Sequence, residues 1–242
     1  MSLSLRSFLN GMADNNMVAV MRLLQFTDSA FPVGTFSFSN GLETASFEKL
    51  VTDAESLEEF ARAQANQAAE SDGIAVLLSH RAFHNGDYDA VKDIDRYLLM
   101  FKMNAEARMM IRRMGKKLAE LGVRLFDSQL ISDWLKDINS NVVPGTYPVA
   151  QGLIFAAAGI GEKELFCSHQ YGVINMVLGA ALRCVKVSHY DTQLILEKLS
   201  GEVSDHYERV KDMDPKDMNA FYPELDILAS LHEKGNMRMF MN

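Results

Sequence analysis

Helical periodicity is the feature that most constrains this chain. Stretches such as "MVAVMRLLQFTDS" and "IAVLLSHRAFH" repeat apolar side chains every three to four residues, which is the spacing of one face of an α-helix. Only "GTFSFS" alternates with the period of a β-strand, and a single strand has no neighbour with which to pair. The pattern predicts an all-α protein, a single-domain bundle of about ten helices with short connecting loops.

Polar residues indicate where several of the expected helices begin. Thr52 and Glu55 have the spacing of a capping box, in which a hydroxyl and a carboxylate each bond a free backbone N–H. Ser132 is expected to cap the helix "DWLKDI", and Ser188 with Asp191 is expected to cap a later helix. The segment "NSNVVPGTYP" is the clearest loop.

Two of the expected helices, "VAQGLIFAAAGIG" and "YGVINMVLGAALRCVKV", are rich in small residues. Gly152 and Ala156 share a face of the first helix, and Gly172 and Gly179 lie in the second. Because small residues let helix backbones approach closely, we expect this pair at the centre of the fold. Neither stretch is typical of a membrane span, since the first is too short and the second carries Arg183.

The composition narrows the class of protein. The 32 acidic residues against 24 basic ones give a net charge of −8, whereas nucleic-acid binders usually carry a basic face. With only Cys167 and Cys184, a disulfide framework is not expected, and a reducing cytosol is the default. The first residues, "MSLSLRSFLNGMADNN", lack the apolar core of a secretory signal. We therefore expect a cytoplasmic protein that binds neither nucleic acid nor membrane.

Common catalytic motifs do not occur in the sequence. It contains no G-x-x-x-x-G-K-[ST] loop for nucleotide phosphates, no G-x-G-x-x-G after a strand and no H-E-x-x-H. The stretch "FPVGTFSFSNGLE" lacks G-x-S-x-G, so Ser37 and Ser39 are expected to be turn and cap serines rather than nucleophiles. The sequence predicts no catalytic residue, no enzyme activity and no stably bound cofactor.

Two groups of residues have metal-ligand chemistry. His80 and His84 are spaced i, i+4 and share one helix face, so they could hold a metal together. Cys167 and His169 offer a thiolate and an imidazole, but residues two apart on a helix point in different directions. We expect His80 and His84 to be ordinary histidines near a helix end, and we predict no metal site.

The segment "EARMMIRRMGKK" concentrates positive charge. Arg108, Arg112, Arg113, Lys116 and Lys117 lie within ten residues of one another. They could contact phosphate or an acidic protein, or they could form a solvated face paired with acids of the same helix. The sequence leaves these alternatives open.

Four stretches together resemble one family. "LLQFTDSAFPVGTFSFSNGLE" is similar to the N-terminal signature of the urease accessory protein UreF. "EARMMIRRMGKKL", "YPVAQGLIFAAAGI" and "LDILASLHEKGNMRMFMN" resemble later blocks of that family, in the family's order. The chain departs from the family where "VKVSHYDTQ" replaces a usual "P-L-G-Q", so that Gln193 alone of that motif is recognisable. The resemblance is to a divergent member.

The resemblance implies a fold and a role. The UreF family is all-α and dimeric, and it acts in the cytosol as a scaffold for nickel delivery to urease. It binds an accessory protein of the UreD (or UreH) type, recruits the GTPase UreG and influences when GTP is hydrolysed. The urease apoprotein is reached through this complex, nickel is handled by the complex as a whole, and the family has no catalytic residues of its own.

The residues that match the family blocks are the candidates for a partner interface. In "FPVGTFSFSNGLE", Pro32 fixes a turn, Gly34 permits a tight backbone, and Phe36 and Phe38 are candidate aromatic anchors. The full set of candidates is Pro32, Gly34, Phe36, Phe38, Gly41, Glu43, Arg108, Tyr147, Gln151, Gln193, His232, Glu233, Arg238 and Phe240.

The domain division follows from the same blocks. Residues 1–16 are expected to be a flexible tail, residues 17–233 the helical domain, and residues 234–242 a C-terminal interaction tail. We expect that tail to be loosely held in the free protein, with Arg238 pairing with the UreD-type partner and Phe240 filling a pocket there. In the alternative, Met239 and Phe240 pack on the core of this chain itself.

Two other functions compete with the scaffold. The small-residue helices could line the pocket of an all-α enzyme or small-ligand-binding protein. His80, His84, Cys167 and His169 could instead make the chain a metal-binding protein.

Overall fold

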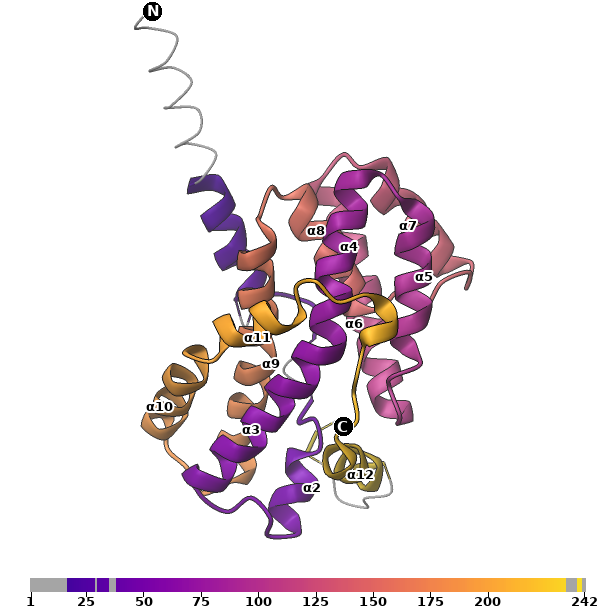
Figure 1. Cartoon of the computed structure of the whole chain (residues 1–242). Coiled ribbons are helices and arrows are strands. Elements are labelled where there is room, and N and C mark those ends of the chain that lie inside the picture. Colours follow the sequence, from indigo (N-terminus) through magenta and orange to yellow (C-terminus); the bar gives the residue numbers. More distant parts are fainter. Residues whose placement is uncertain (1–16, 29, 35–37, 234–238, 241–242) are drawn as a thin grey trace, which may run out of the picture.

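The computed structural model describes residues 17–28, 30–34, 38–233 and 239–240. Their regular structure is helical, and no strand occurs among them (Figure 1). The predicted fold class, all-α in a single domain with short connecting loops, is confirmed. The expected tail over residues 1–16 lies outside the described residues.

An N-terminal helix covers Met17–Thr27. The α-helices that follow are α2 (Leu42–Phe47), α3 (Ala54–Ala68), α4 (Ile74–Asn85), α5 (Tyr88–Leu99), α6 (Ala105–Leu125), α7 (Gln129–Asn139), α8 (Tyr147–Ala157), α9 (Glu162–Cys184), α10 (His189–Ser200), α11 (Val203–Val210) and α12 (Pro223–His232). A π-helical segment, η2 (Ala69–Gly73), joins α3 to α4, and a 3₁₀ turn, η3 (Pro215–Asp217), precedes α12.

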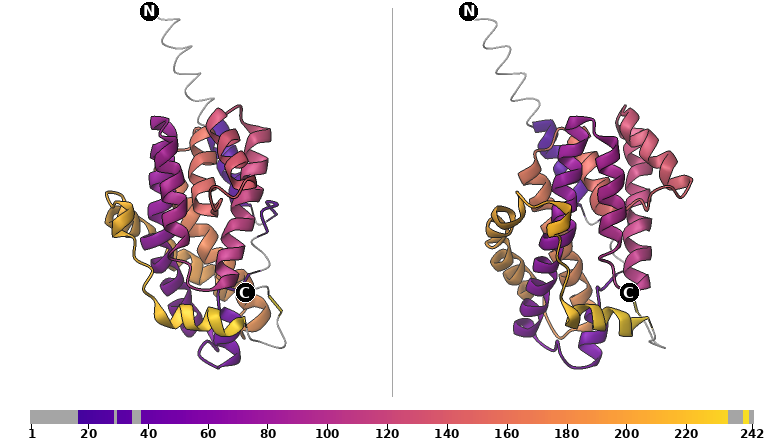
Figure 2. Two further views of the ribbon diagram at one scale, coloured as in Figure 1. Left: turned by 90° about the vertical axis from the view of Figure 1, so that its right-hand side faces the viewer. Right: turned by 45° about the vertical axis from the view of Figure 1, so that its right-hand side comes forward.

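The helices form one elongated bundle with two hydrophobic clusters. In Figure 1, α3 runs on into α4 along the length of the molecule. One cluster, which includes Trp134 and Leu153, lies among α4, α6, α7 and α8, and the other, which includes Leu57 and Leu225, lies among α2, α3, α9 and α12. Helix α9 contributes to both clusters, and α12 crosses one end of the bundle (Figure 2).

Helix α8 is buried on all sides, as its small residues predict. Every residue from Pro148 to Ala156 is buried. A Cβ atom on Gly152 would lie 2.7 Å from the carbonyl oxygen of Val76 in α4, so only glycine permits this approach. On the other side, the side chain of Ile154 fills the space in front of Gly122 of α6. Helix α8 is therefore enclosed between α4 and α6.

Helix α9 departs from the expectation that both small-residue helices are closely packed. A Cβ atom on Gly172 or Gly179 would meet no atom of the described residues within 4 Å. Helix α9 does have the length and the mean hydropathy, 1.2, of a membrane span, but 61% of that window is buried inside the protein. One of its faces packs in the core, and the glycines lie on the other face, which is open.

The loop before α8 is held by a buried carboxylate. Asp95 of α5 is fully buried and accepts hydrogen bonds from the backbone N–H groups of Gly145 and Thr146, both at 2.8 Å. The Thr146 hydroxyl donates a third bond at 2.6 Å. Burial raises the pKa of Asp95 in spite of these bonds. The start of α8 is thus fixed by a residue about fifty positions earlier in the chain.

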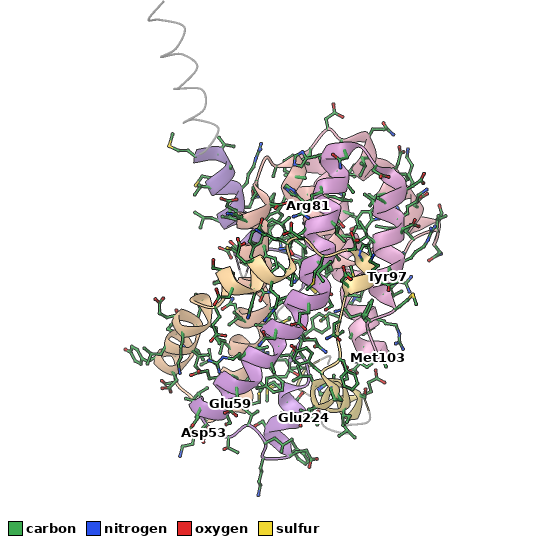
Figure 3. The ribbon with its side chains drawn as sticks, in the orientation of Figure 1. Asp53, Glu59, Arg81, Tyr97, Met103 and Glu224 are labelled. Atoms are coloured by element: carbon green, nitrogen blue, oxygen red, sulfur yellow. The ribbon has the colours of Figure 1, made fainter. Side chains whose placement is uncertain are left out.

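The capping box of α3 is one residue away from the predicted pair. Asp53, labelled in Figure 3, accepts from the backbone N–H of Ser56, whose hydroxyl accepts in return from the N–H of Asp53. The predicted pair of Thr52 and Glu55 is therefore wrong. Asp53 is as good an N-cap residue as Thr52, and the spacing alone did not separate the two.

The cap of α7 also differs from the prediction, whereas that of α10 agrees with it. Helix α7 begins at Gln129, and Ser128 accepts from the N–H of Ile131, so Ser132 lies inside the helix. In α10 the predicted box of Ser188 and Asp191 is present in both directions.

Candidate functional site

The segment that begins at Phe31 is split between surface and core. Pro32 and Gly34 are exposed, and Gly34 has a φ of +91°, a conformation that favours glycine. Phe36 lies outside the described residues. Phe38 is 3% exposed and belongs to the core of the free chain, so its predicted role as a partner anchor would require it to leave this position and stays a prediction. Aromatic spacing alone did not show which ring faces inward.

Gly41 brings α2 against α12. It has a φ of +82° and precedes α2. A Cβ atom at this position would lie 3.0 Å from the backbone nitrogen of Ala229 in α12, which leaves little room for any side chain. This close approach places Glu43 of α2 beside His232 at the end of α12.

The imidazole of His232 lies between two carboxylates. Its Nε2 is 2.8 Å from Glu43 Oε2, and its Nδ1 is 3.0 Å from Glu106 Oε2 of α6. The side chain of His232 is only 2% exposed. Three helices from distant parts of the sequence therefore meet at one buried ring.

The end of the chain is attached to the same carboxylate. The backbone N–H of Met239 donates to Glu43 Oε1 at 2.7 Å, and that of Phe240 donates to Glu43 Oε2 at 3.2 Å. The Phe240 ring is 5% exposed, and the guanidinium carbon of Arg183 lies 3.9 Å from its centroid, a cation–π contact. We call Glu43, Glu106, Arg183, His232 and Phe240 the C-terminal cluster.

The position of Phe240 bears on the expectation for the tail. Its ring packs with α2, α3 and α9 in the second hydrophobic cluster of the free chain, as the alternative interpretation expects, and its insertion into a partner stays a prediction. Met239 remains 59% exposed. Arg238 lies outside the described residues, and its predicted pairing with a partner stays a prediction.

Electrostatics at Glu43 favour its charged form. Burial by itself raises the pKa of this carboxyl, but hydrogen bonds from His232 and from the N–H groups of Met239 and Phe240 outweigh burial and lower the pKa below its ordinary value. Glu43 is therefore an ionised acceptor for both the helix end and the chain end.

Glu233 and Arg108 form hydrogen bonds with the backbone around the start of α6. Glu233 Oε1 accepts from the N–H of Ala105 at 2.6 Å and from that of Glu106 at 3.0 Å, so it caps α6 from the end of α12. Arg108 donates to the carbonyl oxygens of Lys102 and Met103. Both side chains stabilise the connection between α5 and α6.

Tyr147 and Gln151 border a partly open and mainly apolar cavity of about 140 Å³ between α3, α6, α8, α9 and α12. Gln151 Oε1 accepts from His169 Nδ1 at 3.0 Å, and burial lowers the pKa of His169 to about 4, so the ring is neutral. The other ring nitrogen of His169 is buried without a hydrogen bond.

The same cavity contains an ion pair. Asp72 comes from the π-helical segment η2, and its carboxylate lies 2.7 Å from the ammonium group of Lys102. π-Helical turns are often found at functional sites. Met103, labelled in Figure 3, lies at the rim of the cavity, where α5 leads into α6.

A second hollow of about 360 Å³ follows the open face of α9. Its lining includes Phe31, Gly179 and Arg183. It shares Tyr147, Gln151, Gly172 and Met176 with the first cavity. The last candidate, Gln193, is exposed on α10 and lines neither hollow.

The histidines and cysteines considered as metal ligands do not converge. His80 is buried, and its Nε2 donates to the Ile160 carbonyl at 2.9 Å, while the ring of exposed His84 lies edge-on to it. Cys167 is exposed on α9, and His169 is buried on another side of that helix. Among the described residues, no group of three or more His, Cys, Asp or Glu side chains could hold a metal ion.

The basic face of α6 is partly engaged with the protein itself. Arg112, like Arg108, donates to a backbone carbonyl, that of Pro144, at 3.3 Å. Lys117 lies 3.9 Å from Glu120, an exposed pair of small energetic value. The reading of this segment as a solvated and locally paired face is supported for these residues.

The sequence interpretation missed several members of these sites. Glu106 opens the block "EARMMIRRMGKKL", so its position there was a usable signal. Arg183 was visible as a cation within an apolar helix. Asp72 and Lys102 carried no signal, because a π-helical turn and an ion pair between distant residues leave no local pattern.

The geometry defines a helical protein that gathers distant helices at one buried cluster and leaves one hollowed helix face open. Comparison with known proteins identifies the family. The family model described as UreF matches residues 51–200. Urease accessory protein UreF 2 of Brucella canis is 48% identical over 227 residues, which cover 94% of this chain and 93% of that protein.

Two other relatives have the same family name. Urease accessory protein UreF 1 of Brucella melitensis biotype 1 is 47% identical over 227 residues, covering 94% of both proteins. Urease accessory protein UreF of Yersinia pestis is 40% identical over 227 residues, covering 94% of this chain and 100% of that protein. The chain belongs to the UreF family of urease accessory proteins, and the resemblance inferred from the sequence is confirmed.

Proposed function

We propose that the chain is a nickel-insertion scaffold for urease. In this role it binds a UreD (or UreH)-type accessory protein, recruits the GTPase UreG and influences GTP hydrolysis while the nickel centre of urease is assembled. The observation that carries the proposal is the similarity to urease accessory proteins over 94% of the chain. The absence of catalytic motifs from the sequence supports a role without catalysis by this chain.

The proposal extends to location and assembly. The chain works in the cytoplasm, as a homodimer, and reaches the urease apoprotein through the complex. It binds neither nucleic acid nor membrane, and nickel is cargo of the complex rather than a resident cofactor. The candidate interface residues that are exposed are available to partners without rearrangement of the core; they are Pro32, Gly34, Arg108, Gln193 and Glu233.

A deletion strain tests the role directly. In a bacterium whose urease depends on this chain, deletion leaves the urease polypeptide at its normal level but poor in nickel when nickel is limiting. Urease nickel is measured by elemental analysis of the purified enzyme, and a plasmid copy of the chain restores it. Normal nickel content in the deletion strain would overturn the proposal.

A pull-down tests the partners. The tagged chain, expressed with a urease operon, recovers the UreD-type protein and the GTPase together. The purified chain by itself turns over no GTP, since the sequence contains no phosphate-binding loop. Turnover above that of a mock preparation would count against the scaffold role.

A second candidate function, the binding of a small ligand, is favoured by the mainly apolar cavity beside Gln151. The unbonded nitrogen of His169 and the pair of Asp72 and Lys102 add a few polar groups to its lining. This function requires a ligand-dependent rise in melting temperature of the isolated chain, whereas the scaffold role requires none.

A further inference from the structure

The cavity between α3, α6, α8, α9 and α12 has the size of a small organic molecule. Its volume is about 140 Å³, and an apolar protein cavity of about 150 Å³ is large enough to bind benzene. Much of its wall is apolar, with Phe101, Met114, Met176 and Leu225 among the lining side chains. Because the cavity is partly open, a molecule of this size can reach it from the solvent.

Asp226 places a carboxylate in this mainly apolar wall. It lies in the first turn of α12 and is partly exposed. Among the described residues, its side chain accepts one hydrogen bond, from Gln67 Nε2 at 3.5 Å, and the same amide also donates to the Ala220 carbonyl oxygen at 3.2 Å. An ionised carboxylate can accept about four hydrogen bonds, so Asp226 retains acceptor capacity.

The charge of Lys102 does not fully compensate Asp226. The Lys102 ammonium group donates to Asp72 Oδ2 at 2.8 Å, and this ion pair is mostly buried. Burial raises the pKa of Asp226, and it outweighs both the Gln67 hydrogen bond and the more distant charge of Lys102. A carboxylate in this situation is stabilised by a further positive charge close to it, so the cavity suits a cation.

His169 adds an acceptor to the same wall. Its ring is neutral, because burial lowers its pKa to about 4, and its single N–H, on Nδ1, donates to Gln151 Oε1 at 3.0 Å. Nε2 therefore has a lone pair, and this nitrogen is buried without a hydrogen-bond partner. Since buried polar groups are nearly always hydrogen-bonded, the unused acceptor favours a ligand that donates.

We propose that this cavity binds a small primary amine in its protonated form, with an apolar body about the size of a benzene ring. The ammonium group pairs with the Asp226 carboxylate, His169 Nε2 is a second acceptor, and the apolar body packs against Phe101, Met114 and Met176. An ammonium group has three donors and no acceptor, which matches a wall that offers acceptors. The inference rests on the second candidate function, whose ligand class it names, and it does not depend on the scaffold role.

Four probes that share one ring test the ligand class. Benzylamine is positively charged at neutral pH, benzyl alcohol is a neutral donor, toluene has no polar group, and benzoate is an anion. Titration calorimetry of the full-length chain should show benzylamine binding about tenfold or more tightly than benzyl alcohol and toluene, because it alone adds a charge-assisted hydrogen bond. Benzoate should bind most weakly, since it brings a second negative charge to Asp226.

Two variants of α12 locate the charge that matters. Asp226→Asn keeps the size of the side chain but removes its charge, and it should lower the affinity for benzylamine about tenfold while toluene binds as before. Glu224→Gln removes the same charge two residues earlier in the helix. Glu224, labelled in Figure 3, is exposed and is not among the described lining residues, so this variant should bind benzylamine as the parent chain does.

The ¹⁵N resonance of His169 Nε2 gives the position of the ligand in the parent chain. It should move upfield when benzylamine binds, because the lone pair then accepts a hydrogen bond. An unchanged resonance with benzylamine bound, or equal losses in Asp226→Asn and Glu224→Gln, would place the ligand elsewhere and overturn the proposal.

The probe series separates this proposal from the function on which it rests. If the parent chain bound toluene, benzyl alcohol and benzylamine equally, the ammonium proposal would be overturned and small-ligand binding would stand. Binding of none of the four probes would overturn both. These outcomes come from the parent chain, so they decide the matter even if Asp226→Asn failed to fold, and the deletion strain tests the scaffold role separately.

Discussion

Helices α8 and α9 carry similar small-residue patterns but have different surroundings. Gly152 of α8 faces the backbone of α4, with 2.7 Å from its absent Cβ to the nearest oxygen. In the part of the chain that the structure describes, a Cβ atom on Gly172 or Gly179 of α9 would have no neighbour within 4 Å, and both glycines border a hollow of about 360 Å³. The same residue type therefore permits close packing in one helix and leaves an open face in the other.

The comparison shows that glycine in a helix does not always indicate close packing. Glycine costs about 1 kcal/mol relative to alanine in a helix interior. In α8 that cost is offset by burial against α4. In α9 of the free chain, no close packing offsets the cost of the glycines. Such an open face is expected where another molecule binds. Substitutions on the two helices should therefore have opposite effects on stability.

The largest expected effect concerns the support of α8. Asp95→Ala should lower the free energy of unfolding by about 3 kcal/mol or more, because it leaves three buried donors from Gly145 and Thr146 unpaired. Chemical denaturation measures this loss. Asp95→Asn keeps one acceptor oxygen and should lose less. If Asp95→Ala were neutral, the loop would not be what holds α8 in its enclosed position.

A smaller loss is expected at the glycine of α8 itself. Gly152→Ala should lower the free energy of unfolding by about 1–3 kcal/mol, since the new methyl group collides with the α4 backbone at Val76 and with Ser79 Cβ. At this chain length the melting temperature should fall by several degrees, about 2–4 °C per kcal/mol. A variant as stable as the parent chain would show that α4 and α8 can separate without cost.

The smallest effect, of opposite sign, is expected on α9. Gly172→Ala and Gly179→Ala should each raise the free energy of unfolding by up to about 1 kcal/mol, because alanine favours the helix and no atom obstructs its methyl group. Thermal melting of the free chain provides the measurement. A fall in melting temperature at either position would mean that the face is filled in solution, for example by a second copy of the chain.

The fold could be predicted because its signals are local. The apolar spacing of each helix, the absence of strand patterns and the capping box of Ser188 and Asp191 all follow from neighbouring residues. The predicted N-caps of two helices were wrong by a few residues, because more than one residue near each helix start can act as a cap. Asp53 rather than Thr52 caps α3, and Ser128 rather than Ser132 caps α7.

The candidate site could be predicted only in part. The family blocks drew attention to Glu43, His232 and Glu233, which the structure places where α2, α6 and α12 meet; their predicted role in a partner interface stays a prediction. They did not show that Phe38 and Phe240 are buried in this chain. A side chain's direction depends on what packs around it, and that information is not local.

The sequence by itself determined the helical class of this protein and its membership of the UreF family. Helical periodicity is a local pattern, and the order of the family motifs can be read directly along the chain. Only the tertiary structure decided which glycines are enclosed and which are open. It alone brought Glu43 and Glu106 to the two sides of His232, more than a hundred residues away along the chain. Such contacts arise when helices far apart in sequence pack together, and no local pattern in the sequence records them.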